Sequence, residues 1–355
     1  MPDRLEILAV PGLGEIRPGT DLAAAIHHAA PWLRDGDVLV VTSKIVSKAE
    51  GQLVDVPPAG PQRDAAREDI LTAETARLVA RRGATRIVQT HHGFVMAAAG
   101  IDASNVDPSQ LVLLPKDPDA SARALRSALR DRFGLDVAVI VSDTMGRPWR
   151  LGLTDVALGA AGLAPMQDYR GELDPYGNEM HLTQMAVIDE LSGAAELVKG
   201  KFDQVPVAVV RGFLTRPTVD DGPGARLLIR DSELDLFCMG TAEARAAGLT
   251  EAAGLTDVAA FGAATVAPAV LGRVLSTLGV AASTALTVTE PPPDAPAGTA
   301  AAVRCSVADP TDARQLIALG VDVHRLRCAL AAEGLATMHA PTSDATVRLL
   351  VGPTA

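Results

Sequence analysis

The stretch Asp37-Val38-Leu39-Val40-Val41-Thr42-Ser43 decides the first element of the fold. It is a continuous apolar run that ends in small polar residues, which is typical of a strand buried on both faces. Three further runs of this kind are found, at residues 111–114, 137–141 and 207–210. Stretches with helical spacing also occur, at residues 65–82, 120–133 and 184–199. This pattern predicts a mixed fold of helices and strands in the α+β class.

The composition of the sequence changes near residue 244. Alanine dominates beyond it, and the clusters of glycine, aspartate, asparagine and threonine disappear. Residues 290–298 are rich in proline and are interpreted as a semi-rigid linker. We therefore predict one domain at residues 1–244 and a separate small, alanine-rich C-terminal module at residues 245–355.

Composition excludes several classes of function. A net charge of -11 argues against bulk nucleic-acid binding, and 3% aromatic residues argue against stacking platforms for single strands. No apolar run approaches the roughly 18 residues of a membrane span, and the N-terminus does not resemble a signal peptide. Cys238, Cys305 and Cys328 form no CxxC pair and are expected to be reduced. We expect a cytoplasmic protein that binds neither nucleic acid nor membrane.

Two polar clusters directly follow predicted strands, where ligands collect in α/β proteins. Ser142-Asp143-Thr144 offers an anionic and a neutral oxygen, as Mg²⁺ sites commonly do. The stretch at 42–48 has hydroxyl groups and two lysines four residues apart, which suits an anion. It is not a Walker A loop, because GxxxxGK[ST] occurs nowhere in the chain. The alternatives are a helix N-cap for the first cluster and a capped helix with solvated lysines for the second.

Two loops add further candidates. Residues 100–105 combine a carboxylate, a hydroxyl and an amide after a glycine, and could hold a hard cation or form only an Asx-turn. Residues 10–16 contain a Pro-Gly-x-Gly turn that permits close approach to a ligand, although it could be an ordinary turn. The pair His91-His92 is interpreted as structural, and residues 220–224 as a surface turn. Together the clusters suit a nucleoside triphosphate held through a divalent metal.

In chain order, these clusters resemble the coenzyme F(420)-0:L-glutamate ligase family, in the N-terminal ligase part of its actinobacterial bifunctional type. The likeness covers roughly residues 5–244 and consists of several long motifs in fixed order. The matching stretches are 42–48, 92–95, 100–105, 142–150, 152, 154–155, 159, 168–171, 174, 177, 189–191, 194–198 and 206–212.

The resemblance implies a reaction. Such a ligase joins L-glutamate by an amide bond to the terminal carboxylate of F(420)-0, the lactyl phosphodiester of a deazaflavin, and then adds γ-linked glutamates. GTP would phosphorylate the carboxylate, and the glutamate amine would attack the acyl phosphate. The implied cofactors are Mg²⁺ or Mn²⁺, with K⁺ as an additional candidate. The implied partners are these small molecules and a second copy of the chain, in a homodimer with interlocked sheets.

The resemblance also assigns residues to roles. The expected metal ligands are Asp102, Asp143 and Thr144. The expected nucleotide contacts are Leu13, Gly14, Glu15, Ile16, Ser43, Lys48 and Asn105. Catalysis is assigned to Asp102, Asp143 and Lys48, which would offset charge on the transferring phosphoryl group. The preference for GTP over ATP comes from the resemblance alone, because the chain contains no guanine-reading Asn-Lys-x-Asp motif.

The C-terminal module departs from the longest relatives. Residues 313–351 faintly resemble the core of a nitroreductase-like FMN domain, but the arginine-rich run that grips the FMN phosphate is missing. We interpret residues 245–355 as a degenerate remnant that binds no flavin. Two alternatives stay open: a bifunctional ligase with an FMN-dependent dehydro-F(420)-0 reductase, and a non-catalytic nucleotide-binding regulator.

Overall fold

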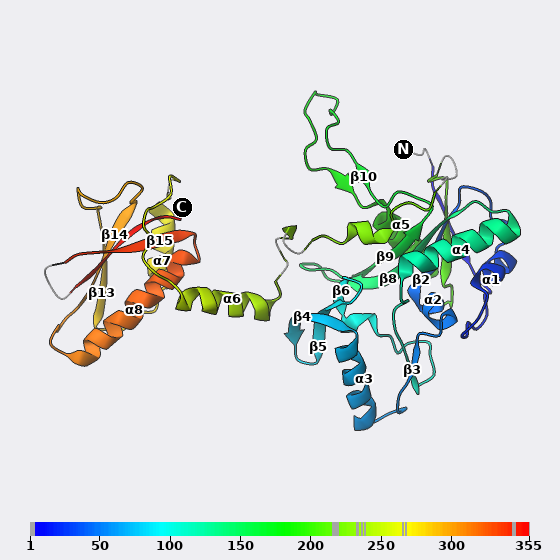
Figure 1. Cartoon of the computed structure of the whole chain (residues 1–355), viewed down its shortest axis with the longest axis horizontal. Coiled ribbons are helices and arrows are strands. Elements are labelled where there is room, and N and C mark those ends of the chain that lie inside the picture. The colour runs from blue at the N-terminus through cyan, green and yellow to red at the C-terminus, as the bar shows by residue number, and fades with distance from the viewer. Residues whose placement is uncertain are drawn as a thin grey trace. The chain divides into compact units, whose positions relative to one another are not determined.

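The structure is a computed structural model that describes residues 4–214, 220–231, 234–235, 237, 239–264, 266, 268–342 and 346–354. The chain divides into two compact units, Met1–Glu243 and Ala244–Ala355 (Figure 1). Cys238 lies outside the described residues, and Cys305 and Cys328 are free thiols. No helix in the described part of the chain is both long enough and apolar enough to cross a membrane.

A five-stranded sheet forms the centre of the first unit, with the order β1-β12-β2-β8-β9. The strands are β1 (Glu6–Val10), β2 (Val38–Thr42), β8 (Ala138–Gly146), β9 (Leu153–Ala161) and β12 (Val207–Arg211). Only β2 and β8 are parallel, and the other neighbours are antiparallel. The four apolar residues of β2 are fully buried, so the predicted strand with two covered faces is confirmed.

Helices cover both faces of this sheet. α1 (Leu22–Ala29), α2 (Ser43–Ala49) and α4 (Pro118–Phe133) pack against one set of strand residues, which includes Val139 and Val141. α5 (Val187–Lys199) packs against the alternate set, which includes Ala138 and Ile140. Alternate residues of a strand point to opposite faces, so one run of sequence serves both layers. The predicted α+β class is confirmed.

Smaller elements surround the sheet. They are β3 (Leu53–Asp55), α3 (Pro61–Ala73), β4 (Thr75–Arg82), β5 (Thr85–Thr90), β6 (Val95–Ala97), the 3₁₀ turn η1 (Ala98–Gly100), β7 (Gln110–Val112), β10 (Gln167–Asp168), β11 (Gln184–Met185) and η2 (Ala225–Leu228). β3 pairs with β7, β10 pairs with β11, and β4, β5 and β6 form a sheet of their own. The predicted helix at 120–133 is confirmed, and the one at 184–199 begins at Val187.

The predicted helix at 65–82 is half wrong. α3 ends at Ala73, and Thr75–Arg82 is strand β4, which pairs with β5 across a turn at Gly83. Leu78 is 43% exposed while Val79 is 8% exposed, as expected for neighbours on opposite faces of a strand. The helical spacing at residues 65–82 is therefore coincidental beyond Ala73.

The second unit contains a four-stranded antiparallel sheet with the order β13-β14-β16-β15. Its elements follow α6 (Thr241–Ala253) and are α7 (Pro268–Thr277), β13 (Thr284–Thr289), β14 (Ala301–Val307), α8 (Ala313–Ala331), β15 (Leu335–Ala340) and β16 (Val347–Pro353). Residues of α7 and α8 pack on the face that carries Val303. The predicted linker at 290–298 is wrong, because this stretch joins β13 to β14, where Thr289 pairs with Ala302.

Candidate functional site

Asp102 is held in place by backbone hydrogen bonds to Val112. Its N–H donates to the Val112 carbonyl and its carbonyl accepts from the Val112 N–H, both at 2.9 Å. Its carboxylate accepts from the Ser104 N–H at 2.7 Å, which is the Asx-turn of the alternative interpretation. The same carboxylate also lies 2.6 Å from the Lys44 ammonium. Asp102 therefore does more than close a turn.

Lys44 and Lys48 lie one turn apart on α2, on the same side of the helix. Lys44 Nζ donates to Ser104 Oγ at 2.7 Å in addition to its pairing with Asp102. Lys48 Nζ donates to the Asn105 carbonyl at 2.9 Å and to Glu15 Oε1 at 3.1 Å. Lys48 is only 9% exposed. The helix of the alternative interpretation is present, but Lys48 is buried in it and not solvated.

Asp143 lies beside this group. Thr42 at the end of β2 pairs with Ser142 in the parallel ladder, so Ser43 and Asp143 follow neighbouring positions at the carboxyl end of β2. Burial raises the pKa of Asp143 to about 6, against a hydrogen bond from the Thr144 N–H, and the nearby charges of Asp155 and Asp102 raise it further. The Lys44 charge acts in the opposite direction. Asp143 is thus close enough to Asp155, Asp102 and Lys44 to sense the charge of each.

Thr144 belongs to a different network. β8 continues through Thr144 to Gly146, so no helix begins there, and the N-cap interpretation of this cluster is wrong. Adjacent strand residues point to opposite faces, which separates the Thr144 side chain from that of Asp143. Thr144 Oγ1 donates to Asp155 Oδ1 at 2.8 Å and accepts from Lys201 Nζ at 2.7 Å.

This second network contains a buried ion pair. Lys199 Nζ lies 2.7 Å from Asp155 Oδ2, and the two side chains are 3% and 2% exposed. Lys199 also donates to Ser142 Oγ at 2.9 Å, and Ser142 Oγ donates to Asp155 at the same distance. Burial alone would raise the pKa of Asp155, but Lys199 and the two hydroxyl groups outweigh it and hold the pKa below its usual value.

Sequence reasoning assigned no role to Lys199, Asp155 or Lys201. Asp155 was noted only as part of a matching motif. Lys199 did leave a signal, because it continues the helical spacing of the buried residues Leu191 and Ala195 on α5. A lysine at a core position of an amphipathic helix indicates a buried anionic partner.

Lys48 also lines a cavity of about 490 Å³. Its lining residues are Glu15, Ile16, Arg17, Pro18, Lys48, Leu53, Val106, Asp107 and Gln110. Three of the predicted nucleotide contacts, Glu15, Ile16 and Lys48, therefore share one cavity. Leu13 instead packs against the core, and Asn105 contributes its carbonyl to Lys48. Gly14 has a φ of 70°, a conformation that glycine adopts without strain.

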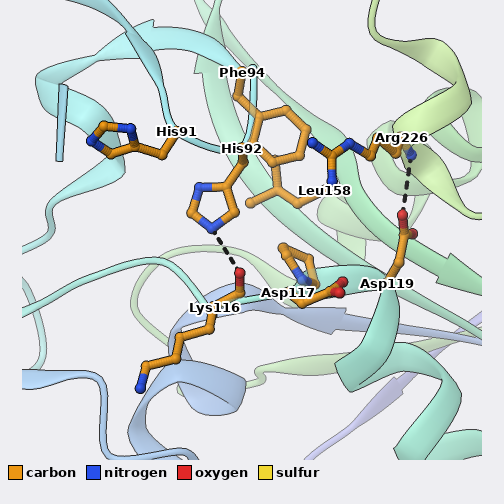
Figure 2. A pocket seen from close by; sticks show the side chains of 9 residues that line it. His91, His92, Phe94, Lys116, Asp117, Asp119, Leu158 and Arg226 are labelled. Atoms are coloured by element: carbon orange, nitrogen blue, oxygen red, sulfur yellow. Dashed lines mark hydrogen bonds between the residues drawn. The ribbon is translucent and has the colours of Figure 1, made fainter. Parts of the chain in front are cut away.

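A second, smaller cavity of about 180 Å³ is lined by His91, His92, Phe94 and Arg226, among others (Figure 2). His92 Nε2 donates to the Pro115 carbonyl at 3.0 Å, and His91 Nε2 to the Ala73 carbonyl at 2.9 Å. These bonds agree with the interpretation of both histidines as structural.

The turn at 220–224 is anchored to the fold. Asp221 Oδ1 lies 2.7 Å from Nη1 of Arg126, whose side chain is 1% exposed. Gly162 N–H also donates to the Asp221 carbonyl at 2.9 Å. A buried arginine and a backbone bond hold the turn, so its interpretation as a simple surface turn is incomplete.

The carboxylate pair could hold a metal ion. Among the described residues there is no group of three or more histidine, cysteine, aspartate or glutamate side chains placed to bind one. Mg²⁺, however, is usually bound by one or two carboxylates, with water and substrate phosphates completing its shell. Asp102 and Asp143 fit this requirement, and the Lys44 ammonium beside Asp102 shows that the position accepts positive charge.

Comparison with known proteins identifies the family. Residues 12–212 match the family model described as F420-0:Gamma-glutamyl ligase. The coenzyme F420:L-glutamate ligase of Methanothermobacter thermautotrophicus is 39% identical over 250 residues, which are 66% of this chain and 98% of the relative. The ligase of the same name from Haloarcula marismortui is 43% identical over 249 residues, 65% of this chain and 95% of the relative. The chain therefore belongs to the F420-0:gamma-glutamyl ligase family.

Proposed function

We propose that this chain is a GTP-dependent ligase that adds L-glutamate to coenzyme F(420)-0 and then adds γ-linked glutamates. The relatives named as coenzyme F420:L-glutamate ligases support the substrate pair. One observation carries the chemistry. Asp102 pairs with Lys44 at 2.6 Å, and both of their charges act on Asp143. Lys48, one turn further along α2, lines a cavity of about 490 Å³.

The nucleotide would lie along α2. Its phosphates would meet Lys44 and Lys48, which supply fixed positive charge in a chain of net charge -11. Its nucleoside would enter the cavity that Lys48 lines. The volume of this cavity is in the usual range for small-molecule sites. Ser43, buried at the first position of α2, would lie beside the phosphates.

Asp102 and Asp143 would hold Mg²⁺ or Mn²⁺, which, when bound, neutralises charge on the transferring phosphoryl group. With a pKa of about 6, Asp143 is mostly ionised at neutral pH and available for this role. Thr144 is a weaker candidate ligand, because its hydroxyl would have to leave Lys201. K⁺ remains a proposal from the resemblance.

The terminal carboxylate of F(420)-0 must be activated before the amide bond can form. A carboxylate is a poor acyl donor at neutral pH, so the terminal carboxylate of F(420)-0 would first take the γ-phosphoryl group and release GDP. The glutamate amine would then attack the acyl phosphate carbonyl, and inorganic phosphate would leave. Lys44 and Lys48 would offset the negative charge that develops in the first step.

Mass spectrometry tests the proposal. F(420)-0 incubated with the full chain, GTP, Mn²⁺ and L-glutamate should gain one glutamyl residue and then more. Asp102→Ala and Asp143→Ala should each lower turnover on the order of 10²-fold. Asp131→Ala is the matched control, since Asp131 is an exposed carboxylate on α4. The proposal fails if no glutamylated product forms, or if the product forms equally well without nucleotide.

We also propose that the chain forms a homodimer. Sedimentation equilibrium of the full chain should give twice the mass of one chain, and a single-chain mass at micromolar concentration would rule the dimer out.

A further inference from the structure

The smaller cavity, which Figure 2 shows, lies on the same face of the central sheet as Asp143. Asp143 and Met145 alternate along β8 and therefore point to one face. Met145 packs in one cluster with Phe94 and Leu158, which line the cavity. Leu158 follows two positions after Val156, the partner of Asp143 in the β8–β9 ladder, so the cavity begins on the order of 10 Å from Asp143. A small molecule in this cavity would lie close to the candidate metal site.

The buried carboxylate of Asp119 ties one wall of this cavity to the sheet. It is 8% exposed and accepts from the N–H groups of Ala160 at 2.8 Å, Ala225 at 2.7 Å and Arg226 at 3.3 Å. Gly224 lies so close that a Cβ there would come within 2.5 Å of this carboxyl group. The backbone of η2, which carries Arg226, is therefore fixed against β9.

Arg226 offers a cation to the cavity. Its side chain is exposed, and within the described part of the chain its guanidinium has no hydrogen bond or ion pair. Figure 2 shows the guanidinium beside Phe94 and Leu158. A guanidinium presents two parallel N–H donors that match a carboxylate. Lys116 lines the same cavity and adds positive charge, which attracts anions.

Asp117 offers an anion to the same cavity. Its Oδ1 accepts from the Ala120 N–H at 2.9 Å and so caps α4, while its Oδ2 has no partner among the described residues. His92 Nε2 donates to the Pro115 carbonyl at 3.0 Å and to the Lys116 carbonyl at 3.2 Å. His92 is therefore a positioning residue, because it fixes the segment that leads into Asp117. The second carboxylate oxygen can accept from an ammonium group of a ligand.

These charges are complementary to an acidic amino acid. L-glutamate carries two carboxylates and one ammonium group, and the cavity presents two cations and one carboxylate oxygen without a partner. A volume of about 180 Å³ is below the usual range for drug-sized ligands, which suits a molecule as small as an amino acid. A neutral amino acid would leave a charged group of the cavity unpaired.

We propose that this cavity binds the incoming L-glutamate, with Arg226 on its side-chain carboxylate and Asp117 on its ammonium group. The inference rests on the proposed function, which supplies L-glutamate as the substrate. It gives Arg226 and Asp117 a role in choosing the amino acid and leaves the nucleotide to the larger cavity beside Lys48.

Calorimetry of the full chain, with GDP and Mn²⁺ present, tests the site without the ligase reaction. L-glutamine replaces the side-chain carboxylate by a neutral amide, and glutarate lacks the amine. Each should bind roughly tenfold more weakly than L-glutamate, because each leaves a charged group of the cavity unpaired. No binding of L-glutamate, or equal affinity for all three compounds, overturns the proposal even if the variants below fail to fold.

Two variants separate the contacts in the ligation assay. Arg226→Gln should raise the KM for L-glutamate roughly 10- to 100-fold and leave the KM for GTP unchanged, because it removes a charge-assisted pair. Asp117→Asn should raise the KM for L-glutamate about tenfold while α4 keeps its cap, since asparagine caps a helix as well as aspartate does. The matched controls are Arg130→Gln, an exposed arginine on α4, and Asp21→Asn, at the N-cap of α1. Both controls should leave both KM values unchanged.

The possible outcomes distinguish the site from the function. Ligation with an unchanged KM for L-glutamate in folded Arg226→Gln or Asp117→Asn protein overturns the proposed site and leaves the proposed function standing. Selective binding of L-glutamate that either variant weakens, without any glutamylation of F(420)-0, refutes the proposed function and leaves the site standing.

Discussion

Replacing Lys199 by methionine should destabilise the first unit strongly. Methionine has a similar length and no charge, so the change leaves Asp155 buried without its cation. The two side chains are 3% and 2% exposed and 2.7 Å apart. Removing one partner of such a pair typically costs about 3–5 kcal/mol of unfolding free energy. For a unit of this size, 1 kcal/mol corresponds to about 2–4 °C, so the melting temperature should fall by roughly 6–20 °C.

The loss should depend on pH in a definite direction. With Lys199 present, the pKa of Asp155 is lower in the folded than in the unfolded protein. Its contribution to stability is therefore complete above the unfolded pKa of about 4 and is lost as the pH falls through the folded pKa. Without Lys199, burial raises the folded pKa instead, and protonation relieves the buried charge. The deficit of the variant should therefore be smaller at pH 5 than at pH 8.

Tryptophan fluorescence is the assay, because both tryptophans of the chain, Trp32 and Trp149, lie in the first unit. Lys201→Met is the matched control. The Lys201 ammonium contacts Thr144 and pairs with Glu196, but the Lys201 side chain is 55% exposed, so the change should cost at most about 1 kcal/mol. The double variant Lys199→Met/Asp155→Asn should lose less than the sum of its single changes. A Lys199→Met melting temperature within 3 °C of the unmodified chain, a margin of about 1 kcal/mol, would refute the reasoning, as would a deficit that grows toward acid pH.

Three further outcomes are expected. Because Asp143 has a pKa of about 6, Mn²⁺ affinity measured by calorimetry should fall about tenfold per pH unit below pH 6, and a flat profile from pH 5 to 8 would contradict this. A chain that ends at residue 243 should retain most of its ligation rate, and a folded, soluble truncation without activity would show that the second unit is required. Asp102→Asn should be nearly as inactive as Asp102→Ala if charge matters, whereas a turn-closing role predicts rescue by asparagine and a loss of only about 1 kcal/mol on replacement by alanine.

The buried strands could be predicted because their signal is local. The run from Val38 to Val41 consists of apolar residues alone, which by itself indicates a buried strand, and the small polar residues that follow mark its end. The partners of each strand could not be predicted in the same way. That β2 lies beside β8, although almost a hundred residues separate them, depends on packing between distant segments. The error at residues 65–82 has the opposite cause, because a few apolar residues fit both a helix and a strand until pairing with β5 selects the strand.

In the candidate site too, residues with a local sequence signal could be found from the sequence, and residues whose role depends on a distant partner could not. Asp102, Lys48 and Asp143 stand in polar clusters after predicted strands or glycines, so the sequence marks them as candidates before the fold is known, and the family resemblance assigns their roles. Lys199 has no such cluster around it, and its importance comes from a partner on another element. Side chains that contact a ligand tend to be grouped in loops. Side chains that support them lie on helices and strands, where their spacing is the same as that of ordinary core residues, so the sequence does not single them out.

Asp143 and Thr144 were predicted as ligands of one metal, yet the strand directs them to different partners. Asp143 senses the charges of Asp155, Asp102 and Lys44. Thr144 donates to Asp155, which pairs with it directly across the β8–β9 ladder. Asp155 in turn holds Lys199 at the end of α5. Asp143 and Thr144, which are adjacent in β8, therefore connect the candidate metal site to the buried ion pair of Asp155 and Lys199. A change in that ion pair should reach Asp143 through the Asp155 charge and through a single peptide unit. Lys199→Met should therefore weaken Mn²⁺ binding as well as stability, while Lys201→Met should cost at most about 1 kcal/mol of stability.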